Sequence, residues 1–276
     1  MNIFFTTKDP LDSIIQDTLK HQTILKTKHI LTGWTNIVIE VTTNQNTYFF
    51  RFPRNPFWSK TIEKDAAVCN FIEGKTSFYT PQMQLFYDLY HRPFSVHKKI
   101  TGYTLNDRIY HLSHSTLTSI AYDIVKFIKE LSSIRLDNAP NKIKVSLSSF
   151  LKELDDKHYA KHLSVDHDFI KRTEKNTLVH GDLNLGNILL NHHDKVIGFI
   201  DFGFAGTGNP NMDVSRILSR PVPDIFATTI LNNFTHPKNH QKLSEINRMK
   251  FIWQHIDAGY ADHIRSHFPE ITLPNL

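Results

Sequence analysis

The chain has 276 residues, a formal net charge of +5 and a single cysteine, Cys69. Hydrophobic residues make up 40% of it, enough for a globular core, while one cysteine excludes an internal disulfide framework. The positive charge is small and scattered, which disfavours a nucleic-acid partner. No apolar stretch approaches the ~20 residues of a membrane helix and the N-terminus lacks a signal-peptide core, so we expect a cytoplasmic protein with no membrane partner.

The first hundred residues combine short strands with two helices. A helix is predicted after Asp9-Pro10, where apolar residues recur at helical spacing, and a second helix over Ser59–Ile72. Five β-rich runs predict strands at His29–Leu31, Asn36–Thr42, Thr47–Phe52, Gln84–Tyr87 and Phe94–Ile100. These elements indicate a small α+β lobe, residues 1–100, built on an antiparallel sheet.

Beyond Gly102 the pattern becomes helical. Thr116–Ile134 has one apolar stripe, and Ser146–Leu163 is predicted to be helical again. Short apolar runs at Thr177–Val179, Ile188–Leu190 and Val196–Ile200 predict strand-like segments. Further helices are expected from Met212 to the end, with interruptions at Pro221, Pro223 and Pro237. We therefore predict a second, larger and mainly helical lobe, residues 101–276.

Two polar loops stand out between Gly181 and Gly208, the segment that holds six of the ten glycines. The first contains His180-Gly181-Asp182 with Asn187 five positions after Asp182, and the second contains Asp201-Phe202-Gly203. Phosphoryl transfer requires a carboxylate that orients the attacking hydroxyl, oxygen ligands for Mg²⁺ and cations for the phosphates. Asp182 is the candidate for the first role, and Asn187 and Asp201 are the candidate metal ligands.

The sequence HGDLNLGN followed by IDFG closely resembles the aminoglycoside phosphotransferase and choline kinase superfamily, in which His-Gly-Asp stands where protein kinases have His-Arg-Asp. The resemblance implies a bilobal protein-kinase-like fold, an α+β architecture with a small sheet lobe and a larger helical lobe. It also implies ATP or GTP as phosphoryl donor, Mg²⁺ as cofactor and a small-molecule hydroxyl as acceptor. Asp182 would be the catalytic residue, with Asn187 and Asp201 as metal ligands.

The same resemblance suggests nucleotide-binding residues in the first lobe. Gly33 lies in the turn that would cover the phosphates, and Arg51 lies where kinases carry the phosphate-binding Lys. Family spacing favours Asp65 over Glu63 as the acidic partner of Arg51. The segment from Phe94 to Gly102 resembles the hinge between lobes, so the backbone at Val96, His97 and Lys98 is expected to contact the purine.

The sequence is compatible with several classes of acceptor. Asp201-Phe202-Gly203 is similar to the aminoglycoside branch, whereas Phe204-Ala205 is also similar to homoserine kinases, and choline or ethanolamine kinases stay open. Family pockets come from the C-terminal helices, so the candidate acceptor residues are Trp253, Asp257, Tyr260 and Asp262. A nucleotide-binding pseudokinase module without transfer activity is the alternative of another class.

Overall fold

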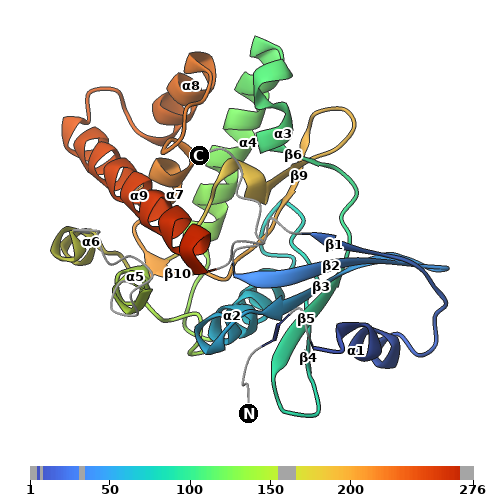
Figure 1. Cartoon of the computed structure of the whole chain (residues 1–276). Helices are drawn as coiled ribbons and strands as arrows, with labels where there is room; N and C mark the ends of the chain where they lie inside the picture. Colours follow the sequence, from blue (N-terminus) through green and yellow to red (C-terminus); the bar gives the residue numbers. More distant parts are fainter. Residues whose placement is uncertain (1–4, 7–8, 31–34, 155–165, 268–276) are drawn as a thin grey trace.

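An antiparallel sheet of five strands forms the N-terminal part of the protein. In the computed structural model, which describes residues 5–6, 9–30, 35–154 and 166–267, its strand order is β1-β2-β3-β5-β4. The elements of this lobe are α1 (Leu11–Thr18), β1 (Ile24–Ile30), β2 (Asn36–Thr43), β3 (Thr47–Pro53), α2 (Pro56–Ile72), β4 (Gln84–Tyr87) and β5 (Pro93–Lys98). Figure 1 shows α1 and α2 beside this sheet.

Side chains along β3 alternate between the core of this lobe and the opposite face of the sheet. Phe50 and Phe52 are fully buried and stack at 6.2 Å between ring centroids. Successive side chains of a strand point to opposite faces, so Arg51, between them, points away from this core. The pattern that makes β3 a strand therefore also places Arg51 on the other side of the sheet.

Two N-terminal elements begin earlier than the sequence predicted. Strand β1 begins at Ile24 rather than His29, because Ile24–Ile30 pairs with β2 although most of its side chains are polar and exposed. Helix α2 begins at Pro56 rather than Ser59, since the Asn55 side chain accepts from the Trp58 N–H at 3.0 Å and proline is tolerated in the first turn. The predicted end of the first strand at Leu31 lies outside the described residues.

The C-terminal part is mainly helical. Its helices are α3 (Leu105–Arg108), α4 (His114–Ser133), α5 (Leu147–Leu154), α6 (His167–Thr173), α7 (Asn211–Ile217), α8 (Asp224–Phe234) and α9 (His240–His267). Its short strands are β6 (Tyr103–Thr104), β7 (Thr177–Val179), β8 (Ile188–Leu190), β9 (Val196–Phe199) and β10 (Gly206–Gly208). Helix α4 buries its apolar stripe against α8 and β7, so it is the centre of this core.

The predicted helix Ser146–Leu163 is described only as far as Leu154, and the rest of it lies outside the described residues. Helix α6 was not predicted. Among the residues that the structure describes, no helix is both long and apolar enough to cross a membrane. The predicted fold class, a small antiparallel-sheet lobe followed by a larger helical lobe, is confirmed (Figure 1). Residue 100 lies between β5 and β6, and the division of the chain there stays a prediction.

Candidate active site

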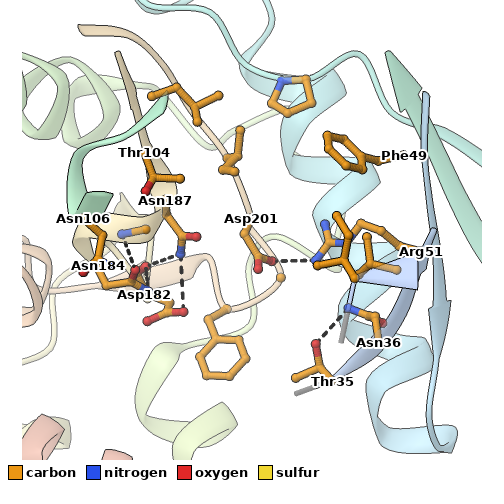
Figure 2. A pocket seen from close by; sticks show the side chains of 18 of the residues that line it. Thr35, Asn36, Phe49, Arg51, Thr104, Asn106, Asp182, Asn184, Asn187 and Asp201 are labelled. Carbon is orange, nitrogen blue, oxygen red and sulfur yellow. Dashed lines mark hydrogen bonds and ion pairs between the residues drawn. The ribbon is translucent and has the colours of Figure 1, made fainter. Parts of the chain in front are cut away.

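The loop between β7 and β8 carries Asp182 and Asn187. The Asn187 Nδ2 donates to the backbone oxygen of Asp182 at 2.8 Å and lies 3.5 Å from its Oδ2. The Asn184 side chain accepts from the Gly186 N–H at 2.8 Å and caps the short 3-10 turn Leu185–Asn187. These local bonds fix the loop, so Asp182 and Asn187 point to the same space (Figure 2).

The backbone conformation of this loop requires a glycine at the position of Gly181. Its φ is +78°, and a Cβ built there would lie 2.3 Å from the carbonyl oxygen of Phe204. The backbone N–H groups of His180 and Gly181 both donate to the Asp213 carboxylate at 2.9 Å. Asp213 is buried on α7, so two hydrogen bonds to its carboxyl group attach the loop to the helical lobe.

His180 orders the loop rather than facing the solvent. It is fully buried, its Nε2 donates to the carbonyl of Ile200 at 3.0 Å, and its Nδ1 accepts from the Asp182 N–H at 3.3 Å. Burial lowers the pKa of His180 to about 4, so the ring is neutral at pH 7. The histidine therefore joins the loop that carries Asp182 to the loop that carries Asp201 by neutral hydrogen bonds.

The second loop presents Asp201 to Arg51 across the two lobes. Asp201 has φ +68°, an uncommon value for a residue with a side chain. Its Oδ1 lies 2.9 Å from Arg51 Nη2, and Arg51 also bonds the buried Asp65 of α2 (Figure 2). Asp65 accepts in turn from the backbone N–H of Phe202 at 2.9 Å. Arg51 and Asp65 thus tie the sheet lobe to the loop that carries Asp201.

Asp182 has a buried cation of its own. Arg216 of α7 donates from Nε to Asp182 Oδ1 at 2.6 Å and from Nη1 to Asp257 Oδ2 at 2.7 Å. Burial acts to raise the pKa of Asp182, and the Arg216 guanidinium opposes that rise. Partial burial also acts to raise the pKa of Asp201, but the Arg51 guanidinium outweighs this effect, so the pKa of Asp201 is lowered.

One cavity of about 650 Å³ joins these groups. Side chains of the sheet lobe, Val38, Phe49, Arg51 and His97 among them, line one end of it. At the other end, which we name the acceptor end, it is lined by Asp182, Phe204, Arg216, Arg220, Trp253, Ile256 and Asp257. The volume lies in the range of small-molecule and cofactor sites.

The other residues that were predicted to bind the nucleotide do not all line the cavity. Gly33 lies outside the described residues. Val96 is 3% exposed and packs in the core of the sheet lobe, His97 lines the cavity, and the Lys98 side chain is exposed. Glu63 bonds Lys142 and Tyr87 and not Arg51, in contrast to Asp65.

Two of the four candidate acceptor residues, Trp253 and Asp257, line the cavity, whereas the side chains of Tyr260 and Asp262 lie outside the described part of the chain.

Arg216 was missed by the sequence analysis. It is a charged residue in a run of helix, and nothing in its local sequence distinguishes it from a solvated surface arginine. Its role depends on α7 packing against α9, which brings Asp257 to it.

A fold of two lobes in which a loop aspartate, an asparagine, a second aspartate and an arginine share one cavity has the parts of a kinase-like phosphotransferase. The model of the phosphotransferase enzyme family (APH) matches residues 26–246. The chain therefore belongs to this family, and the predicted family and enzyme class are confirmed. A comparison with curated proteins finds no match.

Solved structures support the same fold. The chain is similar to the GDP complex of aminoglycoside 2'-phosphotransferase-IIIa, with a TM-score of 0.74, 18% identity and coverage of 96% of this chain and 97% of that one. It is similar to the streptomycin–ATP complex of APH(2")-IIa, with a TM-score of 0.67, 20% identity and coverage of 92% and 91%. A macrolide 2'-phosphotransferase from Brachybacterium faecium gives a TM-score of 0.63, 12% identity and coverage of 96% and 99%.

Proposed function

We propose that the protein transfers the γ-phosphoryl group of ATP or GTP to a hydroxyl of a small molecule. The observation that carries the proposal is the arrangement around the cavity, where Asp182 and Asn187 of one loop face Asp201 and its partner Arg51 (Figure 2). These are the groups that phosphoryl transfer requires: a carboxylate for the hydroxyl, oxygen ligands for the metal and a cation for the phosphates.

In this reaction Asp182 accepts a hydrogen bond from the acceptor hydroxyl and aims its oxygen at the γ-phosphorus. The bond from the acceptor oxygen to phosphorus forms while the bond to the leaving nucleoside diphosphate breaks, and the hydroxyl proton passes to Asp182. The Asp182 side chain is 22% exposed and lines the cavity, so it is both accessible and held in place.

The residues present fit a magnesium site. Asn187 lines the cavity and uses its Nδ2 for the backbone of Asp182, which leaves the amide oxygen as a ligand. The Asp201 side chain is 42% exposed, and its pKa is lowered by Arg51, so it is ionised. Two protein oxygens completed by phosphate oxygens and waters are typical of Mg²⁺. When bound, the ion would neutralise charge on the phosphates.

The donor would occupy the end of the cavity that the sheet lobe lines. Phe49 and His97 lie there with ring centroids 5.6 Å apart, next to the backbone of β5. Burial lowers the pKa of His97 to about 4, so its ring is uncharged at pH 7 and, together with Phe49, offers an aromatic surface suited to a purine. In the proposal the backbone at Val96, His97 and Lys98 contacts the base, Gly33 lies near the phosphates, and Arg51 binds them.

An aminoglycoside-type molecule is the leading acceptor. The proposal draws on structural neighbours that were solved with kanamycin, streptomycin and gentamicin. One observation favours a second candidate, a small hydroxylated amino acid of the homoserine type. In the part of the chain that the structure describes, the charged residues of the acceptor end are two aspartates, Asp182 and Asp257, and two arginines, Arg216 and Arg220. This balance suits a small zwitterion better than a polycation.

The test is Mg²⁺-dependent release of ADP or GDP in the presence of aminoglycosides, choline, ethanolamine, homoserine and simple sugars. One acceptor should stimulate release, and Asp182→Asn should lower that rate about 10²- to 10⁴-fold while nucleotide binding persists. Asp224→Asn, at an exposed position on α8, is the matched control and should keep full activity.

Turnover that is the same in Asp182→Asn and the wild type would refute the proposed role of Asp182. A protein that binds nucleotide but transfers to no acceptor would instead support the pseudokinase module.

A further inference from the structure

Among the described residues, only one oxygen of the Asp182 carboxylate accepts a short hydrogen bond. Arg216 donates from Nε to Asp182 Oδ1 at 2.6 Å, a short charge-assisted bond. The other oxygen, Oδ2, lies 3.5 Å from Asn187 Nδ2, a distance at which a hydrogen bond is weak. The two oxygens of Asp182 are therefore not equivalent: Oδ1 is occupied, whereas Oδ2 can accept from a hydroxyl.

Arg216 itself is fixed at its far end. Its Nη1 donates to Asp257 Oδ2 at 2.7 Å and lies 3.4 Å from the hydroxyl of Ser219. Its guanidinium also lies over the ring of Trp253, 4.9 Å from the centroid, and its side chain is 8% exposed. A planar guanidinium held by carboxylates at two of its edges has little freedom to rotate.

The torsion that turns a carboxylate is soft, so an aspartate without such a partner would present either oxygen over a broad range of angles. We propose that Arg216, anchored by Asp257, is a positioning residue that locks the Asp182 carboxylate so that Oδ2 alone is presented to the acceptor hydroxyl. This inference rests on the phosphoryl transfer proposed above. The arginine does not need to touch the acceptor to act in this way.

The chain contains a close structural counterpart without any catalytic partner. Arg92 is 5% exposed and also bridges two aspartates, Asp9 and Asp88, each at 2.8 Å. This bridge ties the segment before α1 to the β4–β5 turn and does not line the cavity. Arg92 therefore shows what a buried arginine does for stability alone, and Arg92→Ala is the matched control.

The experiment compares Arg216→Ala with Arg92→Ala, at a temperature where circular dichroism shows both to be folded, using the acceptor that the wild type phosphorylates. We expect Arg216→Ala to lower kcat about 100-fold, the order of effect of a misplaced catalytic group, with little change in the KM of the nucleotide. Methylguanidinium added to Arg216→Ala should restore part of kcat in a saturable way. Arg92→Ala should keep the wild-type kcat and should not respond to methylguanidinium.

Two further variants keep the test decisive if Arg216→Ala does not fold. Arg216→Lys retains the charge without the planar bridge and should still lower kcat, about tenfold, because an ammonium fixes no carboxylate plane. Asp257→Asn should lower kcat less than Arg216→Lys, since it loosens only the far anchor.

A folded Arg216→Ala, or Arg216→Lys in its place, with wild-type kcat would overturn the inference and leave the transfer reaction itself intact. Failure of the wild type to phosphorylate any acceptor would overturn the proposed function instead, so the two failures are distinguishable.

Discussion

Two arginine bridges flank the cavity, one at the end that the sheet lobe lines and one at the acceptor end. Arg51 joins Asp201 to Asp65, and Arg216 joins Asp182 to Asp257. In each bridge one aspartate belongs to a catalytic loop and the other to a helix, α2 or α9. Both arginines are almost buried, at 12% and 8% exposure.

The bridges differ in what they connect. Arg51 extends from the sheet lobe to a loop of the helical lobe, so its bond to Asp201 crosses the cavity that the nucleotide would enter. The Arg216 bridge lies entirely within the helical lobe, on α7, α9 and the catalytic loop. The first bridge therefore joins the two lobes, whereas the second joins elements within one lobe and depends on no contact between the lobes. In the proposed reaction Arg51 binds phosphates, and Arg216 orients a side chain.

The largest effect on stability is expected where the first bridge is broken. Arg51→Ala leaves Asp65, which is 1% exposed, as a buried carboxylate without its cation. The expected cost is about 3–5 kcal/mol of unfolding free energy, measured by urea denaturation. Arg51→Ala combined with Asp65→Asn should cost less than Arg51→Ala alone, since the double variant has no unpaired charge.

Glu63→Gln is the control on the same helix. Its partner Lys142 is about half exposed, so the expected change is less than about 1 kcal/mol. Equal losses in Glu63→Gln and Arg51→Ala would contradict the assignment of Asp65 as the partner that matters.

A smaller effect is expected from the backbone that carries the second bridge. Gly181→Ala adds a Cβ at φ +78° and 2.3 Å from the Phe204 carbonyl oxygen. The left-handed conformation costs about 1–2 kcal/mol and the forced shift about as much again. Because that shift moves Asp182 relative to Arg216, activity should fall about 100-fold as well.

Gly74→Ala separates the two contributions. Gly74 has φ +68°, and a Cβ there would meet nothing within 4 Å, so only the cost of the left-handed conformation applies. A Gly181→Ala variant no less stable than Gly74→Ala, with full activity, would show that the loop tolerates the shift.

The smallest effect should come from a buried cation that makes no carboxylate bridge with a described residue. Lys64 is 6% exposed, its Nζ has no hydrogen-bond partner among the residues that the structure describes, and it lies 4.3 Å from the centroid of the Phe150 ring. Burial lowers the pKa of Lys64 to about 8. Lys64→Met should therefore raise the free energy of unfolding at pH 7 by about 1–2 kcal/mol.

The pH dependence of stability tests the burial of Lys64. The pKa of Lys64 is lower in the folded state than in the unfolded state, so its cost is full below pH 8 and disappears as the pH rises towards the unfolded value, 10.5. Wild-type stability should gain this contribution between pH 8 and 10.5, and Lys64→Met should lack the gain. Equal slopes in wild type and variant, measured by denaturation at several pH values, would contradict the burial argument.

Local sequence patterns predicted most of the elements near the active site. The β-rich run Thr47–Phe52 predicted β3, the family resemblance placed Arg51 on it where kinases carry the phosphate-binding Lys, and the apolar stripe of α4 predicted that helix to within two residues. Strand β1 was predicted too short, because its polar, exposed residues lack alternation and only pairing with β2 holds them. Helix α6, seven residues long, has too few turns for a reliable periodic pattern.

The sequence by itself determined the fold class, the family and the loops that carry Asp182, Asn187 and Asp201, since these depend on periodicity and on motifs within a few residues of each other. Only the tertiary structure decided which charges meet. Arg216 and Asp257 are 41 positions apart, and Arg51 and Asp201 are 150 positions apart. Such pairs are set by how helices and lobes pack, because the energy of a buried charge depends on its neighbours in space and not on its neighbours along the chain.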